Sequence, residues 1–142
     1  MSSIFKAYDV RGVYPAELNE ATAERIAQTM REYFGEGAKI VIGHDARLSS
    51  PSLYRAVKRG LKVKSRKSLP AGRQGMSNVV DAGLMTTPML YFLVNDLKAD
   101  GGIMVTASHN PKEYNGLKIV KKGARPVSGV QVQVLMKKYA TA

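Results

Sequence analysis

The chain has 142 residues, which is enough for one domain with a buried core and too few for two ordinary domains. It has no cysteine, which excludes disulfides, Cys–zinc sites and thiol catalysis, and its two histidines exclude a His-rich metal site. No apolar run approaches the ~20 residues of a membrane-spanning helix, and residues 1–6 lack the apolar core of a signal peptide. We therefore expect a cytoplasmic protein without membrane contact.

The net charge of +11 comes from two local blocks. Residues 58–73 hold seven basic side chains and no acidic one, and residues 118–142 hold six and none. Clustered lysine and arginine attract phosphate, so a basic binding module without catalysis is one interpretation of the chain. Residues 62–77 contain no aromatic side chain for stacking on bases, however, so nucleic acid is not the favoured partner. We interpret residues 62–77, which are aperiodic and rich in glycine and proline, as a basic loop insertion.

Strands and helices are predicted to alternate along the chain. The predicted strands are short, mostly apolar runs: residues 4–13 (ending in a turn at Gly12), 39–43, 78–83, 101–105 and 117–120. The predicted helices carry apolar side chains at steps of three and four residues: Asn19 to Gly35, Ser50 to Leu61, Thr86 to Leu97 and 127–139. Ser50 is expected to cap the second helix, with Pro51 at its first position. Asn115-Gly116 is a strong turn signal, which predicts a hairpin before strand 117–120.

This alternation predicts one α/β domain, a three-layer α/β/α sandwich with a mixed, mostly parallel sheet. Open α/β sheets bind ligands at the carboxyl ends of their strands. Residues 106–111, Thr-Ala-Ser-His-Asn-Pro, follow the apolar strand 101–105. Asn110 and Pro111 favour a turn, so we expect the Ser108 hydroxyl on a tight polar loop at the mouth of the sheet.

The neighbouring Ser108 and His109 suggest a hydrolase, but adjacent residues point in different directions and the chain has no Gly-x-Ser-x-Gly elbow. Phosphoryl chemistry is a second interpretation, because a turn of small residues can bind phosphate through its backbone N–H groups. Arg11, Arg47, His109 and Lys118 would then supply charge or protons if the loops converge. The remaining alternative is a turn whose polar side chains only cap their own backbone.

Four motifs, which occur in the family's order and extend over nearly the whole chain, resemble those of the α-D-phosphohexomutases, the phosphoglucomutase/phosphomannomutase family. The motifs are Tyr8-Asp9-Val10-Arg11-Gly12, Gly43-His44-Asp45-Ala46-Arg47-Leu48-Ser49, Gly83-Leu84-Met85-Thr86-Thr87-Pro88-Met89, and Thr106-Ala107-Ser108-His109-Asn110-Pro111 followed by Asn115-Gly116-Leu117-Lys118. The last resembles the family's phosphoserine loop. Two features depart from the pattern: His44 stands where the family usually has arginine, and residues 62–77 replace a short connection.

The resemblance implies a mutase that interconverts hexose 1-phosphates and 6-phosphates in carbohydrate metabolism. Ser108 would give its phosphate to a hydroxyl of a hexose monophosphate and then recover the other phosphate of the resulting bisphosphate. A glucose 1,6-bisphosphate-type activator would maintain the phosphorylated state. Mg²⁺ would bind the phosphate on Ser108 and offset the charge in transfer.

The resemblance also implies roles for further residues. Arg11 and Lys118 match positions implicated in proton transfer and its tuning, and His109 would lie beside the reacting phosphate. Tyr8 and Asn110 would shape the substrate pocket.

The matched motifs belong only to the family's domain I. The acidic metal loop, the sugar-selecting loop and the distal phosphate-binding domain belong to domains II–IV, which we expect to be the partners of this chain. Without them, the resemblance implies an inactive fragment whose choice between glucose and mannose phosphates stays open.

Overall fold

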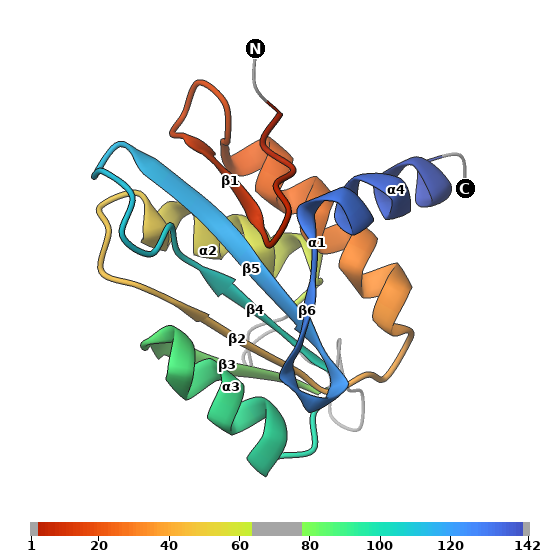
Figure 1. The fold of residues 1–142 in the computed structure, drawn as a ribbon. Helices are drawn as coiled ribbons and strands as arrows, with labels where there is room; N and C mark the ends of the chain where they lie inside the picture. The colour runs from red at the N-terminus through yellow and green to blue at the C-terminus, as the bar shows by residue number, and fades with distance from the viewer. Residues whose placement is uncertain (1–2, 64–77, 141–142) are drawn as a thin grey trace.

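A computed structural model describes residues 3–63 and 78–140 and shows strands and helices in alternation (Figure 1). Nearly all of the predicted basic insertion, 62–77, lies outside the described residues. The strands are β1 (Val10–Val13), β2 (Ile40–His44), β3 (Val79–Leu84), β4 (Gly101–Val105), β5 (Tyr114–Lys121) and β6 (Arg125–Val127). The helices are α1 (Glu20–Phe34), α2 (Ser50–Gly60), α3 (Thr87–Asp96), the 3₁₀ turn η2 (Lys122–Ala124) and α4 (Gly129–Tyr139).

The strands form one sheet in the order β1-β5-β4-β2-β3, and β6 pairs with the other half of β5. Strands β2, β3 and β4 are parallel, whereas β5 is antiparallel to β1, β4 and β6. Among the described strands, β5 alone therefore runs against the common direction. The mixed, mostly parallel sheet predicted from the sequence is confirmed.

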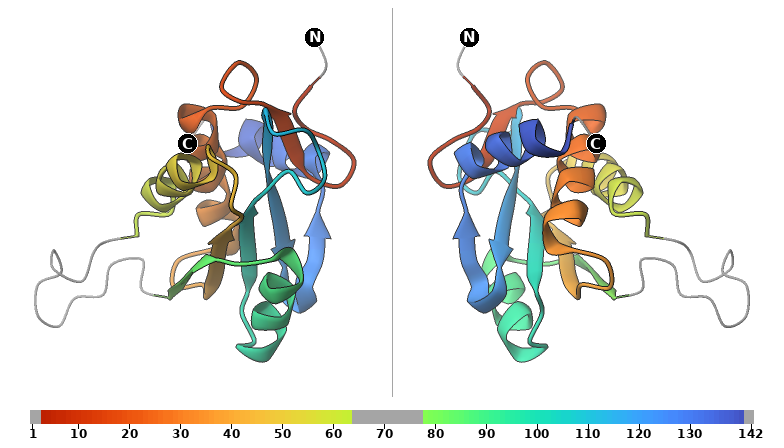
Figure 2. Two further views of the ribbon diagram at one scale, coloured as in Figure 1. Left: turned by 90° about the vertical axis from the view of Figure 1, so that its left-hand side faces the viewer. Right: turned by 90° about the vertical axis from the view of Figure 1, so that its right-hand side faces the viewer.

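Helices cover both faces of this sheet. Helices α1 and α2 lie together on one face, with α4 packed against α1 (Figure 2). Ile103 and Val105 of β4 belong to the core on that side. Met104, between them, packs with Leu90 and Val94 of α3 on the opposite face. This alternation along a strand produces the two apolar layers of the predicted α/β/α sandwich.

Side-chain caps define where three helices begin. The Asn19 side chain accepts a hydrogen bond from the Thr22 N–H of α1 at 3.0 Å. The Thr86 hydroxyl accepts from the first turn of α3, and Ser128 forms a capping box with Gln131 on α4. Each cap satisfies N–H groups that have no partner inside the helix.

The turn predicted at Asn115-Gly116 is wrong, because both residues lie inside β5, opposite Gly12 and Arg11 of β1. A Cβ built on Gly116 would lie 2.3 Å from the Val10 carbonyl oxygen. Glycine is required here because the two strands approach each other closely, so it does not mark a turn. The chain turns earlier, where the Tyr114 N–H bonds the Pro111 carbonyl at 3.0 Å.

Other boundaries differ from the prediction. The predicted first strand, 4–13, is reduced to β1 and one isolated bridge between Phe5 and Val10, and Gly12 is a strand residue. Helix α2 begins at Ser50 itself, with Ser49 in the cap position. Residues 125–127 extend the sheet as β6, so the last helix starts two residues later than predicted. No helix in the described ranges combines the length and apolarity needed to cross a bilayer.

A polar cluster joins α2 to the edge strand β3. The Tyr54 hydroxyl contacts the Asp81 carboxylate and lies 3.0 Å from the Ile42 carbonyl, while Lys58 Nζ lies 2.6 Å from Asp81 Oδ2. Burial and the Asp81 hydrogen bond raise the pKa of Tyr54. Partial burial opposes ionisation of Asp81, but hydrogen bonds from Lys58 and Tyr54 outweigh it and lower the Asp81 pKa.

We expect Gly60→Ala to destabilise the domain by about 1–3 kcal/mol. A Cβ at Gly60 would lie 2.4 Å from the Glu24 carbonyl oxygen and 2.6 Å from the Ala27 Cβ on α1. Helix propensity alone predicts that Gly60→Ala would stabilise the domain, because alanine favours the helix more than glycine does. Urea unfolding measures the difference, with Arg55→Ala as an exposed control on α2. A Gly60→Ala protein at least as stable as wild type would contradict this account of the α1–α2 contact.

Because the pKa of Asp81 is lowered in the folded state, Asp81 should contribute to the loss of folding stability at acid pH. The unfolded chain binds a proton at Asp81 near pH 3.8, whereas the native state does so only at lower pH. The stabilisation is therefore complete above that range and is lost as pH falls through the native pKa. We expect the difference in unfolding free energy between pH 7 and pH 3 to be smaller in Asp81→Asn than in wild type. Asp96→Asn, at an exposed position on α3, is the control; equal differences in wild type and Asp81→Asn would refute the assignment.

Candidate functional site

The candidate site lies at the carboxyl edge of the parallel strands. β2, β3 and β4 end at His44, Leu84 and Val105, and the loops that follow them line one depression of about 510 Å³. Residues 106–111 follow β4, so the loop singled out in the sequence is at the edge where open α/β sheets bind ligands.

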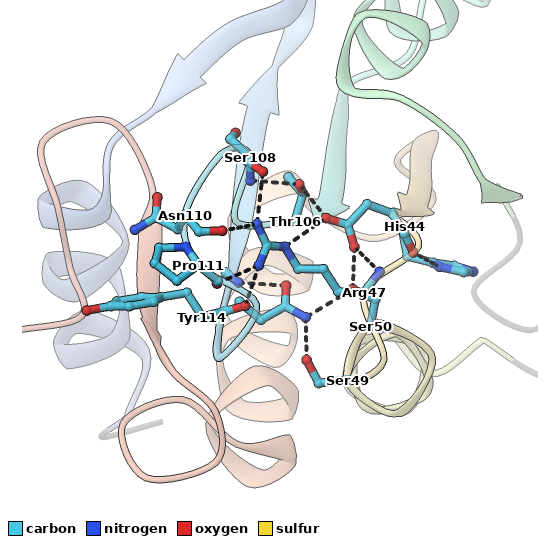
Figure 3. Close-up of polar contacts among 12 residues, drawn as sticks. His44, Arg47, Ser49, Ser50, Thr106, Ser108, Asn110, Pro111 and Tyr114 are labelled. Carbon is cyan, nitrogen blue, oxygen red and sulfur yellow. Dashed lines mark hydrogen bonds and ion pairs between the residues drawn. The ribbon is translucent and has the colours of Figure 1, made fainter.

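Arg47 lies in the loop after β2 and holds the loop after β4 by donating hydrogen bonds to backbone carbonyls of residues 108–114 (Figure 3). One terminal nitrogen of Arg47 donates to the carbonyls of Pro111 at 2.8 Å and Tyr114 at 3.1 Å. The other donates to those of Ser108 at 2.9 Å and Asn110 at 2.7 Å. A planar guanidinium is suited to this arrangement because its donors have a fixed geometry.

Asp45 orients Arg47 and connects the same two loops. Its carboxylate lies 3.4 Å from Arg47 Nε and accepts hydrogen bonds from the hydroxyls of Thr106 at 2.7 Å and Ser50 at 2.5 Å. Its backbone N–H donates to the Val105 carbonyl at 3.0 Å. The start of one loop is thereby fixed to the end of the neighbouring strand.

Ser108 is half-buried and has a positive φ of 54°. Its N–H donates to the Thr106 hydroxyl at 3.0 Å, and its carbonyl accepts from Arg47. Its own hydroxyl has no hydrogen-bond partner within 3–63 and 78–140 and borders the depression, which Met85, Met89 and Met104 also line. The backbone of Ser108 is constrained, while its hydroxyl is open to a ligand.

A second polar cluster gathers Arg11, Lys118 and Asn110 around Asp9, which is only 5% exposed. Asp9 Oδ2 lies 2.5 Å from an Arg11 nitrogen and 3.3 Å from Lys118 Nζ. The other terminal nitrogen of Arg11 donates to the Asn110 side-chain oxygen. Three of the residues predicted for the site are thus brought together, and the Arg11–Asn110 contact ties their cluster to the Ser108 loop.

Strand register explains why these cations share one face of the sheet. Lys118 is paired with Met104, whose side chain faces α3. Val10 and Leu117 pack into the opposite layer, so Asp9 and Arg11, on either side of Val10, point to the α3 face. Asp9 was missed in the sequence, although its two-residue spacing from Arg11 already indicates a shared face.

The other two predicted residues do not join this cluster. His109 is exposed, and within the described part of the chain its side chain has no partner. Tyr8 is 80% exposed. His44, the departure from the family pattern, contacts the Tyr54 ring in a tilted arrangement with 4.7 Å between ring centroids, and its ring points away from the Ser108 loop (Figure 3).

Asn115, which the sequence assigned to a turn, is a buried residue that supports the loops of the candidate site. It is fully buried, and its amide nitrogen donates to the hydroxyls of Ser49 at 2.8 Å and Ser50 at 3.0 Å. Its side-chain oxygen accepts from the Gly116 N–H at 2.8 Å. Asn115 therefore fastens the start of α2 to β5, beneath the loop that Arg47 holds.

The described residues do not by themselves fit a divalent metal. They contain no group of three or more His, Cys, Asp or Glu side chains that could hold one. The two carboxylates within the quoted motifs, Asp9 and Asp45, are each ion-paired to arginine. Mg²⁺ prefers oxygen ligands that are not already ion-paired, and the described residues alone do not supply a cluster of them.

We expect Arg47→Lys to loosen the loop after β4. An ammonium group cannot reach four carbonyls in fixed geometry, so unfolding free energy should fall by about 1–3 kcal/mol. Hydrogen exchange should speed up at the backbone amides of residues 108–110 and 112–114, with Arg55→Lys on α2 as the exposed control. Unchanged protection of that loop in Arg47→Lys would show that the carbonyl contacts do not hold it.

Comparisons with known proteins agree with this geometry. A family model described as "Phosphoglucomutase/phosphomannomutase, alpha/beta/alpha domain I" matches residues 2–142. A phosphohexose mutase of Xanthomonas campestris pv. campestris is 48% identical over 124 residues, which are 87% of this chain and 25% of that protein. A phosphomannomutase of Escherichia coli K12 is 46% identical over 125 residues, 88% of this chain and 25% of that protein.

A solved structure supports the same relationship. The fold is similar to that of a phosphoglucomutase/phosphomannomutase family protein from Burkholderia thailandensis, with a TM-score of 0.75 and 36% identity. The similarity covers 97% of this chain and 30% of that one. The chain spans about a quarter of the length of the curated relatives named above. It belongs to the phosphoglucomutase/phosphomannomutase family and corresponds to the family's α/β/α domain I.

Proposed function

We propose that this chain is the phosphoserine-bearing domain of a hexose-phosphate mutase. The observation that carries the proposal is the placement of Ser108: its backbone is held by Arg47 and Thr106, its hydroxyl is open, and its loop adjoins the Arg11–Asp9–Lys118 cluster. Relatives named phosphomannomutase and phosphohexose mutase support the reaction class.

In the proposed reaction, phosphorylated Ser108 faces a hydroxyl of a bound hexose monophosphate. The bond between phosphorus and the serine oxygen breaks as the sugar oxygen bonds to phosphorus. Lys118 Nζ, as the neutral amine, takes the proton of the sugar hydroxyl and becomes an ammonium paired with Asp9, while the departing Ser108 oxygen takes up a proton from water and returns to a hydroxyl. Arg11, which shares Asp9 with Lys118, tunes that transfer. The bisphosphate then reorients and returns its other phosphate to Ser108 by the reverse steps.

The remaining predicted residues have binding roles in this proposal. Asn110 is held by Arg11 and Arg47 and would orient the sugar, while exposed His109 and Tyr8 would close on the phosphate and sugar once substrate is bound. Ser108, through its phosphate, would be the one Mg²⁺ ligand on this chain, with the others outside it. Because the described carboxylates do not form a metal site, no step is assigned to the ion here.

Domains II–IV of the same enzyme are the proposed partners. Relatives extend well beyond the matched quarter, and exposed apolar side chains are available for contact on two helices: Met89 and Phe92 on α3, and Val130 and Val134 on α4. Isolated, the chain would be inactive. The glucose 1,6-bisphosphate-type activator, the cytoplasmic location and the status of residues 62–77 as an insertion stay predictions.

The test is a chimaera in which residues 1–142 replace the matching segment of the Escherichia coli phosphomannomutase. We expect the chimaera to convert mannose 1-phosphate to mannose 6-phosphate and Ser108→Ala to abolish both turnover and the phosphate detected by intact mass. Ser52→Ala, a serine of α2 that contacts Glu20, is the matched control and should keep activity. Full activity of Ser108→Ala would end the proposal, as would phosphate found on another residue of the active chimaera.

A further inference from the structure

Ser108 has its backbone fixed from both sides, by one side chain of its own loop and by one side chain from the loop after β2. Its N–H donates to the Thr106 hydroxyl at 3.0 Å, and its carbonyl accepts from Arg47 at 2.9 Å. With a φ of 54°, Ser108 adopts a conformation that residues with side chains rarely take unless their surroundings enforce it. These two hydrogen bonds are the enforcing contacts.

Both contacts lead back to one carboxylate oxygen. The Thr106 hydroxyl lies 2.7 Å from Asp45 Oδ2 and must donate to it, because an ionised carboxylate only accepts. The hydroxyl oxygen is thereby left to accept the Ser108 N–H. The same Asp45 Oδ2 lies 3.4 Å from Arg47 Nε, which directs the terminal nitrogens of Arg47 toward the loop carbonyls.

The sheet and the start of α2 also fix Asp45, through contacts outside the serine loop. Its N–H donates to the Val105 carbonyl at 3.0 Å, directly after the parallel pairing of His44 with Val105. Its other carboxylate oxygen accepts from the Ser50 hydroxyl and from the Arg47 N–H at 3.0 Å. The register of β2 and β4 therefore fixes Asp45, and Asp45 in turn fixes the two groups that hold Ser108.

We propose that Asp45, Arg47 and Thr106 form a positioning unit that holds Ser108 in its left-handed conformation and so aims its hydroxyl at the transferred phosphate. This inference rests on the proposed function. None of the three residues is assigned contact with substrate, so they are positioning residues, and their loss should slow phosphoryl transfer more than it weakens sugar binding. Small misplacements of a reacting group lower rates by about 10²-fold.

The experiment compares Thr106→Val and Thr106→Ser in the chimaera. Valine keeps the shape of threonine and removes both hydrogen bonds, whereas serine keeps the hydroxyl. We expect Thr106→Val to lower kcat by about 10- to 100-fold with KM within about threefold, and Thr106→Ser to stay within about threefold of wild type. Arg47→Lys should resemble Thr106→Val, and both should speed hydrogen exchange at the Ser108 amide. Assays run below the melting temperature of every variant.

The outcomes separate this inference from the function on which it rests. Wild-type kcat in Thr106→Val would overturn the positioning unit. A fall of kcat in Thr106→Ser as large as that in Thr106→Val would overturn it too, because serine keeps the hydroxyl. Equal changes of kcat in Arg55→Lys, the exposed control, would overturn it as well. An active Ser108→Ala chimaera would instead defeat the proposed function.

Discussion

The ion pair between Asp45 and Arg47 is the contact on which the site depends. Both residues lie in the loop after β2, and the pair directs the Arg47 guanidinium toward four backbone carbonyls of residues 108–114, which follow β4. Three of those carbonyls belong to the loop after β4 and the fourth to the first residue of β5, and the strand ladders of the sheet do not pair them as they pair regular strands. The charged pair therefore lets an irregular loop pack against the sheet with one hydroxyl, that of Ser108, left open.

Strand β5 makes the second half of the site by running against the other strands. Its antiparallel pairing with β1 and β4 brings Lys118 from late in the chain to the same sheet face as Asp9 and Arg11. Its tight contact with β1 requires Gly116 and buries Asn115 against the start of α2. A buried polar network of this kind fixes one register, because a slip by one residue would turn each side chain to the other face.

The fold could be predicted from the sequence because its signals are local. Apolar runs such as 101–105 and apolar side chains at helical spacing, as from Ala23 to Met30, depend only on neighbouring residues. Asn115-Gly116 was misassigned because the same dipeptide suits a hairpin turn and a close strand contact, and only the partner strand distinguishes them. Ser108, Arg11, Lys118 and Asn110 were predicted for the site from the motifs, and their roles stay predictions. The contacts of Arg47, which reach 61 to 67 residues further along the chain, leave no local pattern.

Because of these long-range contacts, the motif of residues 106–111 does not by itself specify the conformation of its loop. A peptide or an unrelated scaffold that carried Thr-Ala-Ser-His-Asn-Pro would contain the reactive side chain and lack the carboxylate and guanidinium that shape its backbone. Grafting such a loop would require the Asp-x-Arg segment at the end of an adjacent parallel strand. The same condition applies when genomes are searched: the hexapeptide matches this arrangement only where an earlier strand ends in that segment.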